Sequence, residues 1–207
     1  WEHHFDGDAA FTLTWTHDRI EDVIDRVLVA RDDDVFDAPG NIGDGRRDTL
    51  QLDLSAPLDD IGFRGGRIRA SLLASHSAVT DPVTGERRRI SEEKPLDGEI
   101  ELSQDLPAWR TNWGLVVEHI AERKTKYRFD EVEDKSESLG WTLYAERRFG
   151  QHWRLRTQLV DLFGRGFRDD RDKYDGPRSQ VPLEERETRR RRTPGTFEVT
   201  LRREFGG

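Results

Sequence analysis

The chain has 207 residues, enough for one large domain or two small ones, and 37% of them are charged. No uninterrupted apolar run approaches the roughly 20 residues that a membrane-spanning helix needs, so a helical membrane protein is excluded while a membrane β-barrel is not. The net charge of −8 argues against nucleic-acid binding, and the absence of cysteine excludes disulfides and thiolate metal sites. Because the chain also lacks methionine, we expect a fragment or a processed product whose signal peptide lies outside it.

Nine segments alternate apolar and polar residues with the period of two that is typical of a β-strand with one apolar face. In chain order they are Trp1–Phe5, Ala10–His17, Leu50–Leu54, Arg67–Ser75, Glu99–Leu102, Trp113–Val117, Trp141–Arg148, Trp153–Leu159 and Thr196–Phe205. In the last segment, Phe197, Val199, Leu201 and Phe205 share one parity, and mostly charged residues share the other. The pattern predicts an all-β fold. It fits the two sides of a membrane barrel strand as well as the core and solvent sides of a soluble sheet.

The connections between these segments are alternately short and long. The short ones are Asp6–Ala9, Ala56–Gly65, Asp105–Arg110 and Gly150–Gln151, and the long, mostly charged ones are Asp18–Gly45, Thr80–Leu96, Asp130–Lys135 and Gly164–Pro194. In an up-and-down antiparallel sheet every second connection lies at the same edge, so all the long connections are expected on one side. Outer-membrane barrels have this asymmetry, whereas a Greek-key sandwich has no reason to produce it. The stretch 164–194 also has a composition that resembles disordered segments.

Large aromatic residues stand near the ends of several segments. With the last strand running towards the periplasm, Phe149, Trp153 and Phe205 are expected at the periplasmic rim of a barrel, and Trp15 and Trp141 at its outer rim. The alternative is that these aromatics fill the core of a β-sandwich.

Residues 159–167 read Leu-Val-Asp-Leu-Phe-Gly-Arg-Gly-Phe, and Gly195–Phe205 is an alternating segment that ends in an aromatic residue. In this order near the end of the chain, the two elements resemble the C-terminal part of the β-barrel of a TonB-dependent outer-membrane receptor. Leu159–Phe167 is similar to the family's penultimate-strand signature, Asn-Leu-Phe-Asp-x-x-Tyr, with Asp161 in place of the Asn and Phe167 in place of the Tyr. Gly195–Phe205 resembles the closing strand with its terminal aromatic, although Gly206 and Gly207 follow it here.

Two further pieces carry the resemblance nearer the N-terminus. Phe11–Val27 resembles a family strand that runs into an Ile-x-Asp-x-Ile element, here Ile20–Ile24. Asn41–Gly43, followed by Leu50–Leu52, resembles the family's Asn-x-Gly…Gly-x-Glu entry to the next strand, with the Gly-x-Glu part degraded. The resemblance spans nearly the whole chain.

The resemblance implies an antiparallel up-and-down transmembrane β-barrel segment, in which residues 1–207 supply about nine strands of a barrel of about 22. It implies TonB-dependent uptake of a scarce solute, such as a siderophore or a carbohydrate, across the bacterial outer membrane. Its partners would be outer-membrane lipid and lipopolysaccharide, the remaining barrel strands, a plug domain, and TonB, which would contact the missing N-terminal part. We expect no catalytic activity, no cofactor, no metal and no nucleic acid.

Parity and the resemblance together assign residues to three roles. Arg67, Arg69, Arg154, Arg156, Glu198 and Arg202 are expected to face the barrel lumen and its plug. The closing strand supplies a candidate assembly signal, formed by Phe197, Val199, Leu201 and Phe205. Arg189, Arg190, Arg191 and Arg192, next to an acidic run, are candidate external-loop contacts for an anionic ligand or lipopolysaccharide phosphate; the alternative is a solvated loop that pairs internally.

The other sequence features are better explained by structural roles than by metal binding or catalysis. Ile20, Val23, Ile24 and Val27 match one face of a short helix, which predicts a structured external loop. Adjacent His3 and His4 would point to opposite faces of a strand, and together with His17 they are better explained as interfacial or lumen-lining than as zinc ligands. The aspartate runs 32–34 and 169–172 lack the spacing of a calcium loop. None of the hydrolase, zinc-protease, P-loop or dinucleotide-binding motifs is present.

Three alternatives stay open. A passive porin would share the barrel but not an upstream plug sequence. A secreted β-sandwich that binds carbohydrate would fold in buffer without detergent. A barrel enzyme of the outer membrane would show hydrolysis that one carboxylate substitution abolishes.

Overall fold

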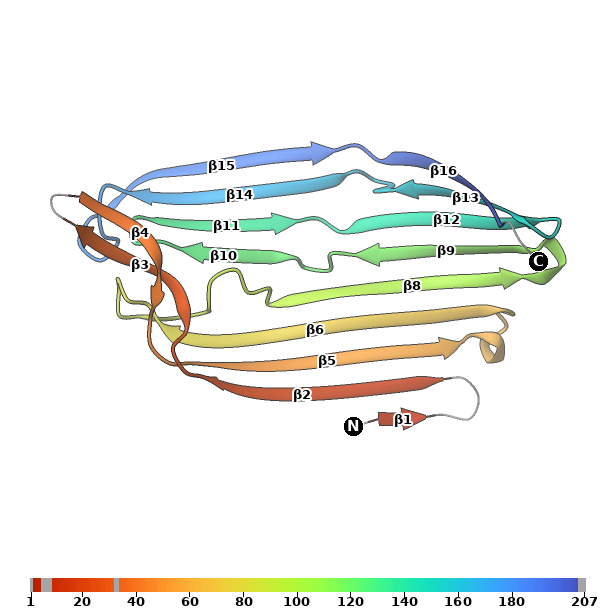
Figure 1. Ribbon diagram of the computed structural model, residues 1–207, viewed down its shortest axis with the longest axis horizontal. Helices are drawn as coiled ribbons and strands as arrows, with labels where there is room; N and C mark the ends of the chain where they lie inside the picture. The colour runs from red at the N-terminus through yellow and green to blue at the C-terminus, as the bar shows by residue number, and fades with distance from the viewer. Residues whose placement is uncertain (1, 5–8, 32–33, 205–207) are drawn as a thin grey trace.

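The computed structural model describes residues 2–4, 9–31 and 34–204, and most of them belong to antiparallel β-sheets. Nine strands form a single hydrogen-bonded path in the order β1-β2-β5-β6-β8-β9-β12-β13-β16, and the short β7 adds to β6 (Figure 1). Their bounds are β1 Glu2–His4, β2 Ala10–Ile20, β5 Gly45–Pro57, β6 Gly66–Thr80, β7 Arg87–Arg88, β8 Leu96–Leu106, β9 Thr111–Glu118, β12 Gly140–Phe149, β13 Trp153–Val160 and β16 Thr196–Arg203. The prediction of an all-β antiparallel meander of about nine strands is confirmed for the described residues.

The remaining strands form excursions from this path. A hairpin of β3 (Ile24–Arg31) and β4 (Asp34–Asn41) connects β2 to β5, and a second sheet has the order β10-β11-β14-β15. The strands of that sheet are β10 Arg123–Tyr127, β11 Glu131–Glu137, β14 Arg165–Tyr174 and β15 Leu183–Thr193. Figure 1 shows the excursions at one end of the main sheet and the short turns at the other. The predicted alternation of short and long connections is therefore present in the fold.

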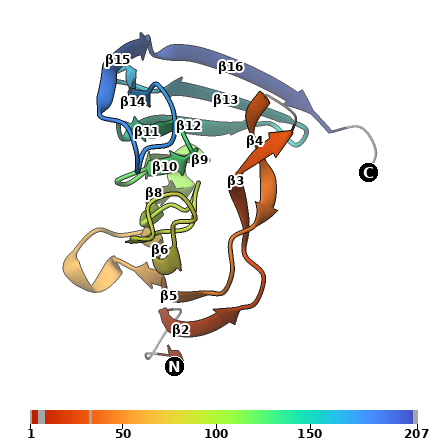
Figure 2. The ribbon, with the colours of Figure 1, turned by 90° about the vertical axis from the view of Figure 1, so that its left-hand side faces the viewer.

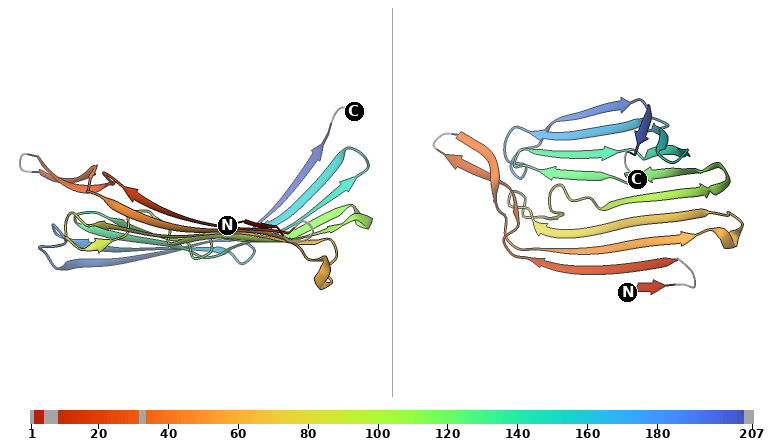
Figure 3. Two further views of the ribbon diagram at one scale, coloured as in Figure 1. Left: turned by 90° about the horizontal axis from the view of Figure 1, so that it is seen from below. Right: turned by 45° about the vertical axis from the view of Figure 1, so that its right-hand side comes forward.

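The main sheet is curved into an open trough (Figures 2 and 3). In Figure 2 its strands follow an arc from β2 to β16, and the β3–β4 hairpin stands apart on the concave side. Within the described residues β1 and β16 are the two ends of the path and do not pair with each other, so no closed barrel is present. No described helix is long and apolar enough to cross a membrane.

Strand register divides the main sheet into two chemically different faces. Residues paired directly across antiparallel strands point to the same side, and the register runs Ile68, Leu102, Leu115, Leu143, Leu159, Phe197 across six strands. We call the side that carries this row the apolar face. One residue further along, the row reads Arg67, Ser103, Gly114, Tyr144, Gln158, Glu198, and we call its side the polar face.

The apolar face has no covering layer among the described residues. Among the described residues only Val23, Val79 and Tyr144 are buried hydrophobic residues, whereas on the apolar face Trp15 is 68% exposed and Phe197 is 63% exposed. Every pair of elements in extensive contact is a pair of hydrogen-bonded neighbouring strands, so no second sheet packs across the first. The buried Ser103 and Tyr144 lie on the polar face, which is the more enclosed of the two.

Three predictions of local structure were wrong. The segment from Ile20 to Val27 is the end of β2, a turn and the start of β3, not a helix. The charged stretch 164–194 contains the whole β14–β15 hairpin and is therefore not a loop or a disordered segment, although its charges do pair internally, as Arg186 does with Asp172. Residues 131–135, predicted as a connection, belong to β11. Trp1, Phe5, the turn at 6–8 and Phe205–Gly207 lie outside the described residues.

Candidate functional site

The six residues predicted to share a lumen-facing side do share one side of the sheet. The register places Arg67 and Glu198 in the polar row above, and Arg69 opposite Glu101. Arg154 and Arg156 of β13 lie opposite Arg202 and Thr200 of β16. The parity assignment therefore agrees with the register, while the presence of a lumen at this face stays a prediction.

A polar network crosses this face around Tyr144. The Tyr144 hydroxyl donates a hydrogen bond to Glu101 Oε1 at 2.6 Å, and Arg69 forms an ion pair with the other carboxylate oxygen of Glu101 at 3.0 Å. The Arg156 guanidinium stacks 4.4 Å from the centroid of the Tyr144 ring. These contacts join β6, β8, β12 and β13 and leave the face charged but internally paired.

The candidate assembly signal lies on the opposite side. Phe197, Val199 and Leu201 face away from the polar network, are 57% to 63% exposed, and belong to the last strand of the path. Phe205 lies outside the described residues, so its placement is untested.

The arginine run lies in a strand instead of a loop. In β15, Arg189 and Arg191 point to one side of the excursion sheet, and Arg190 and Arg192 to the other, because neighbouring strand residues alternate. Arg189 forms an ion pair with Glu187 at 2.5 Å, and Arg191 stacks 4.8 Å from the centroid of Phe167. Four guanidiniums that project to two sides of a sheet do not converge on one ligand.

Four buried charged groups form a cluster that the sequence did not indicate. Arg88 Nη1 forms an ion pair with Asp25 Oδ2 at 2.8 Å, and its Nε forms one with Asp81 Oδ2 at 2.6 Å. Arg178 Nη2 approaches the same Asp81 oxygen to 2.8 Å. All four side chains are less than 10% exposed, and they come from β3, the β6–β7 turn, β7 and the β14–β15 connection. We call this set the ionic cluster.

Hydrogen bonds and ring contacts hold the ionic cluster in place. Tyr127, at the end of β10, lies beside both guanidiniums, with ring-centroid distances of 4.5 Å to Arg88 and 5.9 Å to Arg178. Burial alone would raise the pKa of Asp81. Hydrogen bonds from Arg178 and Arg88 and from the backbone N–H groups of Thr84 and Val83 outweigh it and lower this pKa to about 2. The cluster therefore ties β3, the β6–β7 turn, β7 and the β14–β15 connection together through buried ion pairs.

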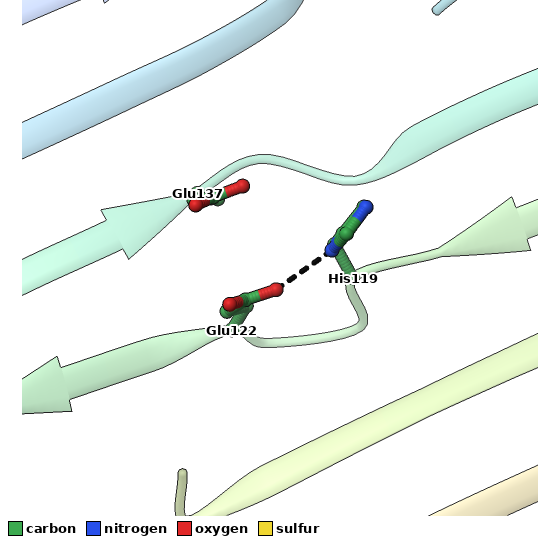
Figure 4. A group of neighbouring side chains, drawn as sticks. All are labelled: His119, Glu122 and Glu137. Atoms are coloured by element: carbon green, nitrogen blue, oxygen red, sulfur yellow. Dashed lines mark hydrogen bonds and ion pairs between the residues drawn. The ribbon is translucent and has the colours of Figure 1, made fainter. Parts of the chain in front are cut away.

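His119, Glu122 and Glu137 form the one group of described residues whose donor atoms gather closely enough to suggest a metal, all within 4.8 Å of one another (Figure 4). Other contacts already neutralise this group. His119 Nδ1 lies 2.7 Å from Glu122 Oε2, Lys94 Nζ lies 3.1 Å from Glu122 Oε1, and Arg165 forms an ion pair with Glu137. Burial would raise the pKa of Glu122, but hydrogen bonds with His119 and Lys94 lower it overall. The geometry supports an ion-pair network better than a metal centre.

The remaining histidine and aspartate candidates are also accounted for by protein contacts. His17 Nδ1 lies 2.7 Å from Asp48 Oδ1, while the side chains of His3 and His4 lie outside the described residues. In the run 169–172, Asp169 pairs with Arg171, Asp170 with Arg168, and Asp172 with Arg186. The run 32–34 lies outside the described side chains.

Sequence reasoning missed the ionic cluster because its members are far apart along the chain. Arg178 and Asp81 are separated by 97 positions, and Arg88 and Asp25 by 63. One local signal was present: Asp81 precedes Pro-Val-Thr-Gly, and its carboxylate accepts hydrogen bonds from the N–H groups of Val83 and Thr84. This is the turn that aspartate favours, and it fixes the carboxylate in place.

No family model matches the chain, and no curated protein or solved structure matches it.

Proposed function

We propose that this chain is a section of the wall of a transmembrane β-barrel, and that the whole protein is a TonB-dependent outer-membrane receptor that takes up a scarce solute. The observation that carries the proposal is the uncovered apolar face, which continues in register across the main sheet and backs onto a charged face. A soluble sheet of this kind needs a second layer to cover its apolar side. In an outer-membrane barrel, lipid covers that side.

The dimensions of the apolar face support a membrane setting. On β6 it extends from Ile68 to Ala74, which is roughly 20 Å at about 3.4 Å per residue. The lipid-facing band of such barrels is about 25 Å tall. Beyond the short-turn end of this stretch Phe149 lies opposite Trp153, and at its other end Trp15 lies in the row of Leu50 and Ala74. Trp141 lies in the row of Val117 and Ile100, within the stretch. Aromatic residues at the two ends of the apolar stretch fit the girdles of a membrane barrel.

The open edges support a larger barrel. Beyond β1 and β16 no described strand continues the sheet, and unpaired backbone groups at a sheet edge are not tolerated in hydrocarbon. We therefore propose that the remaining barrel strands pair with both edges. The charged polar face would then line the interior and meet a plug domain, and the excursions would form part of the external vestibule.

The TonB-dependent class rests on the sequence resemblance, chiefly on Leu159–Phe167 and the closing strand. Leu159 and Phe197 are paired in neighbouring strands, so these two elements lie side by side. The proposed solute is a siderophore, a carbohydrate or a similar scarce compound.

A pair of adjacent single cysteines tests the membrane setting. Leu72→Cys and Ser71→Cys put thiols on the apolar and polar faces of β6, and this chain has no cysteine of its own. The full-length protein, freed of any other cysteine, is labelled with a fluorophore and placed in vesicles that contain brominated lipids. We expect strong quenching at position 72 and little at position 71. Equal quenching at both sites, or a protein that stays folded in buffer without lipid or detergent, contradicts the proposal and favours the β-sandwich.

Uptake distinguishes the receptor from a passive porin. The gene is expressed in strains with and without TonB that lack other receptors, and growth is measured on ferric siderophores and on oligosaccharides at limiting concentration. A receptor supports growth only in the strain with TonB. Equal growth in both strains identifies a porin.

A further inference from the structure

Arg19 on β2 and Arg46 on β5 face each other on the apolar face of the main sheet, beyond its last row of apolar residues. The register of β2 and β5 is uninterrupted and pairs Trp15 with Leu50, His17 with Asp48, and Arg19 with Arg46. All three pairs therefore lie on the apolar face, in successive rows towards the excursion end. Both Arg19 and Arg46 are exposed.

This arginine pair lacks a counter-charge among the described residues. Like charges directly opposite each other in an antiparallel sheet destabilise the pairing. The acidic side chain in the adjacent row of this face, Asp48, is engaged by His17 at 2.7 Å. On the polar face, by contrast, Arg69 lies opposite an acidic residue, Glu101, and forms an ion pair with it at 3.0 Å. Two guanidiniums held together without an acid form a site that favours an external anion.

The surroundings indicate which anion. Arg46 lies opposite Ala78 on β6, and this small side chain leaves space beside the guanidinium. His76 lies in the same face, opposite Asp48, and is exposed. Guanidinium groups bind phosphate oxygens in a bidentate manner, and two of them can share one phosphate group.

The position of the pair relative to Trp15 selects a lipid as the source of the phosphate. Arg19 lies four residues beyond Trp15, about 14 Å along the strand, which is about 10 Å along the membrane normal for a strand tilted by about 45°. Trp15 marks the end of the apolar stretch on β2. Arginine side chains at such a boundary extend towards the headgroups while their stems stay on the apolar surface.

From this placement we propose that Arg19 and Arg46 bind the phosphate of an anionic lipid headgroup at the outer wall of the barrel, with the acyl chains of that lipid lying along Trp15 and Leu50. The inference rests on the proposed function, because only a lipid-covered apolar face puts this row at headgroup level. It assigns a specific lipid contact to residues distinct from the arginine run of β15.

The test measures lipid binding to the full-length protein in an uncharged maltoside detergent by native mass spectrometry. The probes are short-chain phosphatidic acid, the diacylglycerol with the same chains, and inorganic phosphate. We expect saturable binding of phosphatidic acid. Binding should be at least about tenfold weaker for diacylglycerol, which lacks the phosphate, and for inorganic phosphate, which lacks the acyl chains. Equal binding of diacylglycerol overturns the proposal, and equal binding of inorganic phosphate shows a free-anion site and overturns the lipid assignment.

Paired variants locate the site. Arg19→Gln/Arg46→Gln is expected to weaken phosphatidic acid binding by about tenfold or more. The charge-matched control Arg31→Gln/Arg64→Gln changes exposed arginines at the β3–β4 tip and in the β5–β6 turn, and should bind like the parent. Arg19→Lys/Arg46→Lys keeps the charge without the bidentate geometry and should give an intermediate affinity. Equal losses in the Gln pair and in its control overturn the proposal.

The brominated-lipid experiment separates failure of this inference from failure of the proposed function. Quenching at position 72 should be unchanged in Arg19→Gln/Arg46→Gln, because the apolar face is intact. Normal quenching without phosphatidic acid preference refutes the headgroup site alone, whereas absent quenching refutes both.

Discussion

Tyr144 on β12 lies against Gly114 on β9, and only a glycine at that position lets it reach Glu101 on β8. The two residues are paired in register, and a Cβ atom added at position 114 would lie 2.6 Å from the Tyr144 hydroxyl oxygen and 2.7 Å from two of its ring carbons. Tyr144 thereby crosses an entire strand and joins three strands through one side chain. The absence of a side chain at Gly114 is the reason that this crossing is possible.

Gly114→Ala should therefore destabilise the protein by about 1–3 kcal/mol, as expected for overpacking. The methyl group displaces Tyr144, and the hydrogen bond to Glu101 and the stacking with Arg156 are lost with it. Denaturant unfolding of the full-length protein in detergent measures the change. In a Tyr144→Ala background the clash is gone, so the same substitution should be neutral or slightly stabilising. An equal cost in both backgrounds would show that the contact does not constrain position 114.

Leu72 and Leu73 provide a matched pair for the two faces of β6. Leu72 lies opposite Leu52 and Gly98 on the apolar face, whereas Leu73 lies opposite Gln51 and Asp97. Leu72→Lys should cost about 2–4 kcal/mol if it lies near the centre of a bilayer. Leu73→Lys should cost much less, because the new ammonium faces Asp97. Unfolding in lipid vesicles gives both values, and equal costs would contradict the assignment of faces.

The ionic cluster should make the excursion end sensitive to acid in a defined window. The folded pKa of Asp81, about 2, lies below its ordinary value of 3.8, so its carboxylate contributes stability above about pH 4. That contribution is lost as the pH falls from about 4 to about 2. Amide hydrogen exchange of the segments around Asp81 and Arg178, referenced to unfolded peptides, should show protection that declines across this interval.

Asp81→Asn is the corresponding variant. It leaves the buried Arg88 and Arg178 short of a negative charge, and removal of one partner from a buried ion pair costs about 3–5 kcal/mol. The excursion end should then exchange faster at every pH, and the acid window should disappear. A variant that retained the same window would show that another group is responsible.

The sequence patterns sufficed for the main sheet because one physical rule governs it. A strand with one apolar side alternates, and Leu50–Leu54, Trp153–Leu159 and Phe197–Leu201 could be placed on one face from parity alone. The same rule assigned Arg154 and Arg156 to the other face. The alternation did not predict how strongly the sheet curves, because curvature depends on the twist between successive strands and not on the parity of their side chains.

The strands of the second sheet were not predicted, because ion pairs between their side chains stabilise them and their sequences lack the alternation of apolar and polar residues. In β14 and β15, Arg186 pairs with Asp172 across the hairpin, and Arg171 pairs with Glu133 on β11. Such ladders have the composition of a disordered segment although they specify a register. Val23 and Val27 matched a helical period by coincidence. Their real contacts are cross-strand: a Cβ atom at Gly40 would lie 2.5 Å from Val27 Cγ2, so these strands pack closely.

The group of His119, Glu122 and Glu137 yields a prediction about metal. Lys94 and Arg165 already neutralise the two carboxylates, so Zn²⁺ should leave the thermal unfolding temperature of the parent protein unchanged. In Lys94→Ala/Arg165→Ala the carboxylates lose these cations and repel each other, and a divalent cation can then take their place. Zn²⁺ should raise the unfolding temperature of that variant, and a further His119→Ala should weaken the effect. Stabilisation of the parent by Zn²⁺ would instead identify a metal site that displaces the two ion pairs.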